Sequence, residues 1–486
     1  MLPPSDPDTP FADADLPPVA QTPERVTVGP PVAPRYAPSA PRLPGSKYYT
    51  LRYLLNALLA DGESVLARPA LSDDTAVLAR ALRALGATAR WEQSDDAARW
   101  NLRVVGVGGH PQRPADGVLR MGNAGAALRL LLGIGALLPE IRFETDHPDS
   151  LGRRPNADLL DALRALGIEA EAREPGGRLP ITLRGGPPRG GAVSVAGRNS
   201  SQYLSALLYL APLLAAGLTI SVTDGLRSQP LVRATLRALA AAGIHVEAAD
   251  DLLAFRVAGG QRFQPRAYRI PGDTPSAAAL VAAALMLGAP LRLEGLAAQD
   301  DDLRALLAAC DSLGLPLVER PTEAAPDAPL TLAGGQAIKQ TGWHPFTRRI
   351  DGDAIIDSVP ALVALACLIP GETRFERVAT LRLKESDRIG DLCAEFTRAG
   401  ADVTPLSDAI IVRGRPNGLP GGVTVDAHDD HRLAQALAIL ATRCQRGLTI
   451  TGAASVAKSY PWFFDDLRGL GADLTPRPPL PRGEGE

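Results

Sequence analysis

One short pattern recurs six times along this chain of 486 residues. It is a helix with leucines at helical spacing that ends at a glycine and is followed by a β-like run. Glycine is expected there because the residue after a helix often takes a left-handed conformation. The six glycines lie 71 to 86 residues apart, at Gly86, Gly167, Gly243, Gly314, Gly400 and Gly471. Six copies at near-equal spacing predict a chain built from repeated α/β units.

Each unit also contains an earlier and more apolar helix. Most of these helices are followed by a turn and a β-like run such as Leu218–Val222, so each unit reads as strand, helix, strand, helix, strand. These helices carry apolar residues on nearly all of their faces, which predicts that the helices are buried. We expect them at Leu51–Ala60, Ala126–Leu138, Gln202–Ala216, Ala277–Leu287, Ala361–Ile369 and Leu433–Arg443.

Composition excludes several classes of protein. The net charge is −3, whereas a dedicated nucleic-acid binder carries a broad basic excess. No apolar run reaches the roughly 18 residues that span a bilayer, so we expect neither a nucleic-acid nor a membrane partner. No His/Cys grouping has metal-ligand spacing, which predicts that no metal is bound. The cysteines lie far apart in apolar stretches, which favours buried thiols at Cys310, Cys367, Cys393 and Cys444.

The two ends of the chain differ from its middle. The first 44 residues hold 13 prolines and several acids, which predicts a disordered extension over residues 1–42. If this extension packs on the body, the β-like run Glu24–Val28 is the part that would do so. Residues 476–486 read as a second disordered tail. Neither end carries a secretory or transit signal, so the expected location is the cytoplasm.

The basic residues are strongly skewed, with 47 arginines and four lysines. Where arginine has replaced lysine almost everywhere, a surviving lysine marks a position where arginine cannot serve. Lysine is a compact charge whose proton its environment can move, while arginine stays charged and planar. Lys339 lies in an undistinguished polar loop, which leaves Lys47, Lys384 and Lys458 as candidates for function.

Residues capable of chemistry cluster at or just before the apolar helices. Helix N-termini attract anions because their N–H groups are unpaired and carry a partial positive charge. Eight cations lie at such starts or in loops after strands, namely Lys47, Arg52, Arg129, Arg154, Lys384, Arg388, Arg432 and Lys458. If these cations converge, they focus a strong field that two anionic substrates would balance. The pattern therefore predicts a site for multiply charged ligands.

Most of these motifs also have simpler explanations, which the sequence leaves open. A helix N-cap needs only an Asp or Ser, and a surface ion pair needs only opposite charges three or four residues apart. The simpler assignments are N-caps for Asp73–Asp74 and for Ser200–Ser201, a surface position for Arg154, surface salt bridges for KESDR (384–388), and a solvated imidazole at a capped helix start for His431. No P-loop or dinucleotide fingerprint occurs in a strand-to-helix context.

Six motifs in order resemble those of the 5-enolpyruvylshikimate-3-phosphate (EPSP) synthase family: LPGSK, GNAG followed by AALR, SSQYL, LKESDRI, DDHR and AKSYP. The resemblance runs from about Leu43 to about Thr475. It implies an α/β fold of the two-domain inside-out barrel type, with six βαβαββ repeats whose helix N-termini converge on an interdomain cleft. It also implies one domain over 46–270 and another over 43–45 with 271–475, so that the chain crosses between them near Gly45 and Pro271.

The resemblance implies transfer of the enolpyruvyl group of phosphoenolpyruvate to the 5-hydroxyl of shikimate 3-phosphate, with release of phosphate, by a monomer that uses no cofactor. This reaction belongs to the shikimate pathway to aromatic amino acids. The implied catalytic residues are Glu385, which moves a proton to and from the enolpyruvyl methylene, its partner Lys47, and Asp357, which takes the proton of the attacking hydroxyl. The implied phosphoenolpyruvate contacts are Lys47, Gly125, Arg154, Gln202, Arg388, Arg432 and Lys458. The implied shikimate 3-phosphate contacts are Lys47, Arg52, Ser200, Ser201, Gln202, Ser228, Asp357 and Lys384.

The chain departs from the family pattern at several positions. On the acceptor side, Tyr48, Leu231 and Thr380 stand where the family usually has Ser, Tyr and Asn. On the helix after GNAG, Ala126 and Leu130 replace Thr and Pro, which predicts weaker inhibition by glyphosate. Three alternatives remain: transfer to a modified cyclitol, a non-catalytic paralogue that binds an anionic metabolite, and transfer to a UDP-sugar. The last is disfavoured because no cysteine lies in a glycine-rich loop.

Overall fold

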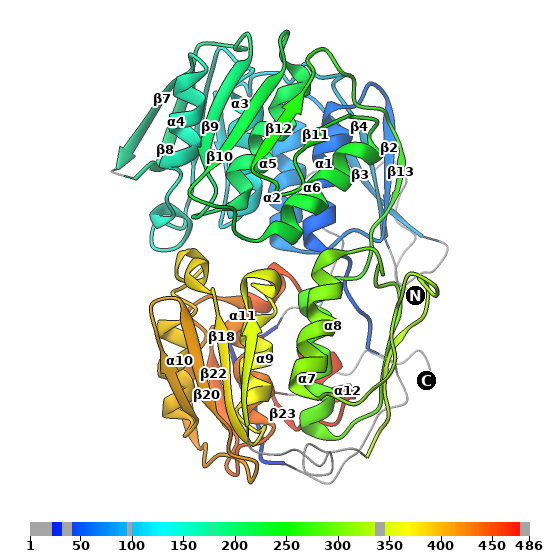
Figure 1. Ribbon diagram of the computed structural model, residues 1–486, viewed down its shortest axis with the longest axis vertical. Helices are drawn as coiled ribbons and strands as arrows, with labels where there is room; N and C mark the ends of the chain where they lie inside the picture. Colours follow the sequence, from blue (N-terminus) through cyan, green and yellow to red (C-terminus); the bar gives the residue numbers. More distant parts are fainter. Residues whose placement is uncertain (1–21, 32–40, 95–99, 175, 336–345, 477–486) are drawn as a thin grey trace, which may run out of the picture.

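The computed structural model describes residues 22–31, 41–94, 100–174, 176–335 and 346–476. Within these ranges the chain forms two lobes stacked along the long axis of the molecule (Figure 1). The first lobe holds the elements from Lys47 to Arg269, and the second holds those from Thr274 to Thr475 together with Arg25–Val28. The predicted tail lies outside the described residues except for Pro476, and Lys339 lies outside them as well.

The first lobe contains three four-stranded sheets, each with its own helices. In sheet order, the first is β13 (Ala267–Arg269), β2 (Glu63–Ala67), β4 (Trp100–Val105) and β3 (Thr88–Gln93), with α1 (Lys47–Leu59) and α2 (Asp73–Ala84). The second is β5 (Val118–Arg120), β6 (Glu140–Glu144), β8 (Arg178–Arg184) and β7 (Glu169–Glu174), with α3 (Gly125–Gly135), η1 (Leu151–Arg153) and α4 (Ala157–Ala165). The third is β11 (Glu247–Ala248), β12 (Ala254–Val257), β10 (Leu218–Thr223) and β9 (Gly191–Ala196), with α5 (Ser201–Leu210), η2 (Ala211–Leu213) and α6 (Gln229–Ala241).

The second lobe repeats this plan. Its first sheet is β14 (Leu291–Leu293), β16 (Leu330–Leu332) and β15 (Leu317–Glu319), with α7 (Thr274–Leu287) and α8 (Asp301–Leu313). Its second is β17 (Phe346–Asp351), β18 (Gly371–Glu376), β20 (Ala409–Arg413) and β19 (Asp402–Pro405), with η4 (Asp353–Ile355), α9 (Val359–Ala366), η5 (Ala379–Leu383) and α10 (Gly390–Arg398). Its third is β21 (Val423–Asp426), β22 (Leu448–Thr451), β1 (Arg25–Val28) and β23 (Leu474–Thr475), with α11 (His431–Ala441), η6 (Ala453–Lys458) and α12 (Phe463–Gly469).

The repeat predicted from the glycine spacing is confirmed. In the unit that starts at β17, β18 pairs parallel to β17 across α9, and β20 then pairs antiparallel to both β18 and β19. All six helix-ending glycines have positive φ, between 69° at Gly314 and 107° at Gly471. A side chain at this φ would be strained, which is why glycine recurs there.

Helices fill the inside of each lobe and sheets form its outside. The apolar helices α1, α3 and α5 lie in one core and α7, α9 and α11 in the other; every residue from Ala277 to Leu285 is at most 3% exposed. Strands such as β10 alternate between buried and exposed residues, as expected of a sheet with one face on a core. The predicted inside-out α/β fold and the buried apolar helices are confirmed.

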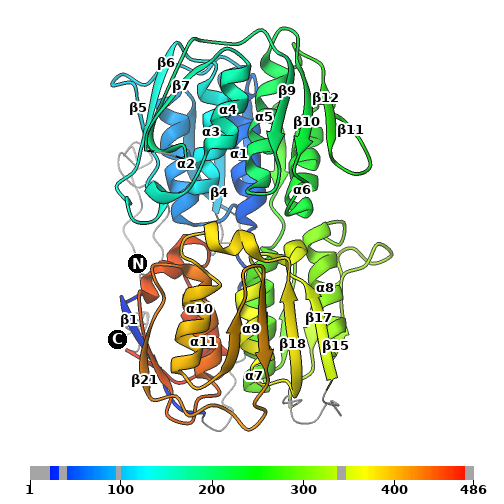
Figure 2. The ribbon, with the colours of Figure 1, turned by 60° about the vertical axis from the view of Figure 1, so that its left-hand side comes forward.

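The prediction of disorder over residues 1–42 is wrong for residues 22–31 and 41–42, and the run Glu24–Val28 is, as expected, a part that packs on the body. β1, labelled on the second lobe in Figure 2, pairs antiparallel with both β22 and β23. Its side chains Val26 and Val28 are buried. Proline density predicted disorder, but the prolines flank the run RVTV instead of interrupting it. Valines at alternate positions give a strand one apolar face, which can pack on the core. The last unit itself contributes β21, β22 and β23, and β1 takes the place between β22 and β23.

The chain passes between the lobes twice, and the two passages lie side by side. Gly45 pairs with Gly272, the Ser46 N–H donates to the Pro271 carbonyl at 2.7 Å, and the Asp273 N–H donates to the Pro44 carbonyl at 2.9 Å. A Cβ on Gly45 would lie 2.1 Å from the Arg68 carbonyl, so this passage requires glycine.

The four cysteines are buried free thiols, as expected. Over the described ranges, no helix is both long enough and apolar enough to cross a membrane.

Candidate active site

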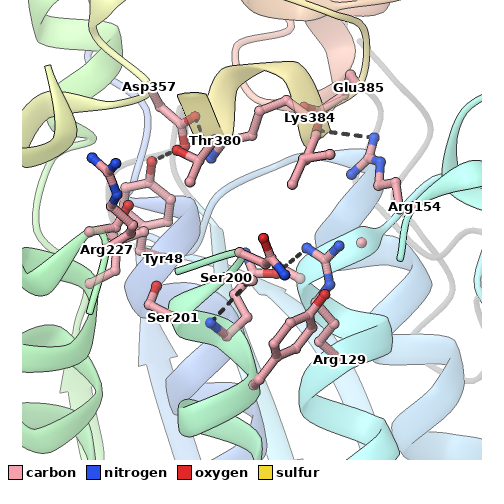
Figure 3. A pocket seen from close by; sticks show the side chains of 18 of the residues that line it. Tyr48, Arg129, Arg154, Ser200, Ser201, Arg227, Asp357, Thr380, Lys384 and Glu385 are labelled. Carbon is pink, nitrogen blue, oxygen red and sulfur yellow. Dashed lines mark hydrogen bonds and ion pairs between the residues drawn. The ribbon is translucent and has the colours of Figure 1, made fainter. Parts of the chain in front are cut away.

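A cavity opens between the two lobes where helix N-termini meet. Its lining includes the starts of α1, α3, α5 and α11, together with residues that precede α6, α9 and α10. Figure 3 shows Asp357, Thr380, Lys384 and Glu385 along one wall and Tyr48, Ser200, Ser201 and Arg129 along the other. Of the predicted site residues, eleven line it: Lys47, Gly125, Arg154, Ser200, Ser201, Gln202, Ser228, Asp357, Lys384, Glu385 and Arg388.

The wall from the first lobe carries polar groups fixed by helix starts. Ser200 is the N-cap of α5, and its hydroxyl accepts a hydrogen bond from the Gln202 N–H at 3.2 Å. Arg129 donates to the Gln202 side chain at 2.8 Å and lies over the Tyr203 ring, 5.5 Å from its centroid. Lys47 begins α1 and pairs with Asp74 at 3.2 Å. This wall therefore presents buried cations and hydroxyls to the cavity.

Asp357 anchors the opposite wall. Its Oδ1 accepts from Arg388 Nη1 at 2.8 Å and lies 3.0 Å from Lys384 Nζ, while its Oδ2 accepts a short hydrogen bond from the Tyr48 hydroxyl. Burial by itself raises the pKa of Asp357, but the charges of Lys384, Arg388 and Arg432 outweigh burial and hold it well below its usual range. Asp357 is therefore an anion in a cationic frame.

Glu385 lies in a second ring of cations. Its carboxylate contacts Arg388 Nη2 at 2.7 Å, Lys458 Nζ at 3.3 Å and Arg154 Nη2 at 3.6 Å. Burial raises the pKa of Glu385, while Arg154, Lys458 and Arg388 lower it more, so it lies well below the usual range. Arg388 bridges the two carboxylates and also pairs with the Asp430 carboxylate through Nε at 2.7 Å.

Three predicted site residues do not line the cavity. Arg52 uses all three side-chain nitrogens inside its own lobe, on Thr235, the Tyr48 carbonyl and the Leu231 carbonyl. Arg432 contacts Gln435 and Asp273. Lys458 lies behind the lining and reaches Glu385 and, at 2.6 Å, the Asn123 carbonyl of the other lobe. The ligand contacts assigned to these three residues stay predictions.

Several of the simpler explanations are wrong. Arg388 is 1% exposed and Arg154 6%, so neither is a surface residue. His431 is buried, not solvated, and burial together with Lys47 and Arg432 lowers its pKa well below 6.5. Ser72, and not Asp73 or Asp74, is the N-cap of α2. Ser200 does cap its helix, as that explanation proposed.

Sequence reasoning did not assign the roles of three contributors to this site. Asp74 is 3% exposed and pairs with Lys47, Asp430 holds Arg388, and Arg227 reaches across to Asp408 at 3.1 Å. The motif DDHR contains Asp430 and gave a usable signal for it. Each partner is distant in sequence, so spacing alone could not identify these pairs. In the part of the chain that the structure describes, no group of three His, Cys, Asp or Glu residues could hold a metal ion.

Comparisons with known proteins agree with this arrangement. The family model for EPSP synthase (3-phosphoshikimate 1-carboxyvinyltransferase) matches residues 39–467. A 3-phosphoshikimate 1-carboxyvinyltransferase of Deinococcus radiodurans is 42% identical over 430 residues, which cover 88% of this chain and 92% of that protein. One from Halobacterium salinarum is 34% identical over 447 residues, 91% of this chain and 98% of that protein.

Solved structures agree in fold. The structure of EPSP synthase from Acinetobacter baumannii superimposes with a TM-score of 0.72 at 24% identity, covering 93% of this chain and 99% of that one. An enolpyruvyl transferase from Streptomyces tendae superimposes with a TM-score of 0.70 at 19% identity, over 93% and 98% of the two chains. Together with the family match and the close relatives, these results place the chain in the EPSP synthase family of 3-phosphoshikimate 1-carboxyvinyltransferases.

Proposed function

We propose that the protein transfers the enolpyruvyl group of phosphoenolpyruvate to the 5-hydroxyl of shikimate 3-phosphate and releases inorganic phosphate. Family membership supports the reaction. The observation that supports its location is the pair of largely buried carboxylates, Asp357 and Glu385, which Arg388 bridges on the second-lobe wall of the cavity. Two anionic substrates and two proton transfers need this combination of cations and carboxylates.

The donor end of the site is proposed around Glu385. Lys47, Arg154, Arg388 and Lys458 are 1% to 7% exposed, so their charges act in a poorly hydrated space. Gly125 leaves room beside them, because a Cβ there would lie 2.5 Å from Arg154 Nη1. The phosphate and carboxylate of the donor would bind the cations that pair with Glu385 in the free protein. Gln202 and Arg432 complete the proposed donor contacts.

The acceptor end is proposed around Asp357. The proposed contacts are Lys47, Arg52, Ser200, Ser201, Gln202, Ser228, Asp357 and Lys384. Ser228 lines the cavity, which supports its proposed contact, and its N–H donates to the buried Asp353 of the other lobe at 2.9 Å, which ties the start of α6 to the opposite wall. In the addition step Asp357 accepts the proton of the attacking hydroxyl, and the acceptor oxygen bonds to the central carbon of the donor.

Glu385 is proposed to move the second proton. During addition it protonates the methylene carbon, and during elimination it takes that proton back while the phosphate leaves. Its pKa is held low in the free protein by Arg154, Lys458 and Arg388. A bound donor shares those cations, which raises the pKa of Glu385 toward the range in which it can donate.

The domains are proposed as 46–270 and as 43–45 with 271–475, to which the pairing of β1 adds Arg25–Val28, with the paired passages at Gly45 and Gly272 as the hinge. A monomer in the cytoplasm remains the expectation from the family. Gel filtration and light scattering test whether the protein is a monomer.

A second candidate function is transfer to a modified cyclitol. Tyr48, Leu231 and Thr380, the three departures on the acceptor side, all line the cavity. Their position favours an acceptor whose contacts differ from those of shikimate 3-phosphate.

A phosphate-release assay tests the proposal. Purified protein with phosphoenolpyruvate and shikimate 3-phosphate should release phosphate continuously, and either substrate alone should release none. Turnover with another cyclitol phosphate but not with shikimate 3-phosphate would replace the first function by the second. Binding of both substrates without turnover would identify the non-catalytic paralogue.

A further inference from the structure

The two oxygens of Asp357 have different partners. Oδ1 contacts two cations, Lys384 and Arg388, of its own lobe. Oδ2 accepts from a neutral donor, the Tyr48 hydroxyl, which comes from the opposite lobe (Figure 3). A hydroxyl can pass on a proton and take another, whereas an ion-paired guanidinium holds its protons. Oδ2 is therefore the oxygen suited to accept a proton.

Tyr48 lies at the start of α1 and lines the cavity. Burial first, and then the charges of Asp357 and Asp302, raise the pKa of Tyr48 well above 10, so its hydroxyl stays protonated and donates. Over the described residues its oxygen accepts no hydrogen bond, so its lone pairs are open to a hydroxyl in the cavity. The same wall carries Ser200 and Ser201, where the acceptor is proposed to lie.

We propose that Tyr48 relays the proton between the acceptor hydroxyl and Asp357, an inference that rests on the proposed function. As the acceptor oxygen bonds to the donor carbon, the acceptor O–H bond breaks and its proton moves to the Tyr48 oxygen. The hydroxyl proton of Tyr48 moves at the same time to Asp357 Oδ2. Tyr48 ends the step neutral, Asp357 ends it protonated, and no phenolate forms.

A different role for Tyr48 would be that of a plug that fills acceptor space and must swing out. The two roles predict opposite effects of removing the hydroxyl while keeping the ring. A plug without its hydrogen bond leaves more easily, whereas a relay without its hydroxyl cannot transfer the proton.

The test compares Tyr48→Phe with the matched variant Tyr49→Phe. The Tyr49 hydroxyl donates to Asp300 of the other lobe at 2.5 Å, outside the cavity, so its loss also removes one Tyr–Asp bond between the lobes. Single-turnover rates are measured with both substrates, together with the KM of shikimate 3-phosphate. For the relay, Tyr48→Phe should slow the chemical step by about 10²-fold or more at a nearly unchanged KM, while Tyr49→Phe stays within about threefold of the wild type.

Solvent isotope data provide a second readout. With the relay, three protons move during addition, two through Tyr48 and one from Glu385, whereas direct transfer to Asp357 moves two, so the dependence of the single-turnover rate on the fraction of D2O should be curved in the wild type and less curved in Tyr48→Phe. A linear dependence, a Tyr48→Phe rate near that of the wild type, a change in KM alone, or an equal loss in Tyr49→Phe would each overturn the relay. A wild type that turns over while Tyr48→Phe is unaffected refutes the relay alone; a wild type that releases no phosphate refutes the proposed function and the relay with it.

Discussion

Removal of β1 should destabilise the second lobe, although it lies in a proline-rich segment. The perturbation is a chain that starts at residue 32, compared with one that starts at residue 22. Only the first lacks the strand that lies between β22 and β23. Both lack residues 1–21, so the comparison isolates β1.

The structure allows a rough magnitude. Val26 and Val28 are 3% and 0% exposed. Burial of a valine side chain contributes about 1.5–3 kcal/mol, so the two together contribute about 3–6 kcal/mol. For a lobe of this size 1 kcal/mol shifts the Tm by roughly 2–4 °C, which predicts a loss of at least about 6 °C.

Removal of β1 should also weaken donor binding at the proposed site. The Glu24 carboxylate accepts from the Gly452 N–H at 2.8 Å, and its carbonyl accepts from the Ala453 N–H at 3.0 Å. These bonds hold the start of η6, whose last residue is Lys458. We therefore expect the KM of phosphoenolpyruvate to rise more than that of shikimate 3-phosphate.

Thermal unfolding by calorimetry and steady-state kinetics on both chains provide the assay. Glu24→Ala, which keeps the strand but removes one bond to η6, should raise the donor KM with a smaller change in Tm. Melting temperatures within about 2 °C of each other would refute the assignment of β1 as a stabilising strand.

The remaining predictions concern the site itself. Glu385→Gln should keep substrate binding but lose about 10²–10⁴ in rate, measured by single turnover, and a near-normal rate would remove Glu385 from the mechanism. Lys384→Ala should weaken shikimate 3-phosphate binding in calorimetry, because Lys384 lies 3.0 Å from Asp357; unchanged affinity would contradict this. Gly125→Ala should raise the donor KM, since the new Cβ would displace Arg154, and the crystal structure of the variant would show whether it does. Glu385 has a lowered pKa, so its stabilising contribution is present above about pH 4 and is lost as the pH falls through its folded value; acid unfolding of Glu385→Gln should depend less on pH there. Ala126→Thr with Leu130→Pro should increase sensitivity to glyphosate in inhibition curves; equal sensitivity would show that this helix does not set it.

Local sequence patterns predicted most of the fold. The glycines after the helices have positive φ, and the fully apolar helices such as α7 are buried, because both features follow from a few neighbouring residues. The same holds for Ser200, whose cap needs only Gln202 two residues later. The β-like run at Glu24–Val28 was visible in the sequence, but its pairing was not predicted because its partners lie more than 400 residues away, at Thr449 and Ile450.

The contacts between the lobes could not be predicted from local sequence. Tyr48 and Asp357 are 309 positions apart, and Lys458 and Asn123 are 335 apart. Sequence identified the charged residues of both lobes, and the resemblance assigned their roles. Which oxygen each one contacts depends on how the lobes pack. The same limit holds within one lobe, where Arg52 donates to Thr235, 183 positions away.

Detection of the enol ether product is the most direct test of the claim that the two substrates meet at Asp357 and Glu385. Protein incubated with phosphoenolpyruvate labelled with carbon-13 in the enolpyruvyl group and with shikimate 3-phosphate should be followed by NMR. The labelled group should appear on the 5-oxygen of the acceptor, one for each phosphate released, and only when both substrates are present. Phosphate released without a labelled acceptor, or a labelled group on another oxygen, would contradict the proposed site and its chemistry.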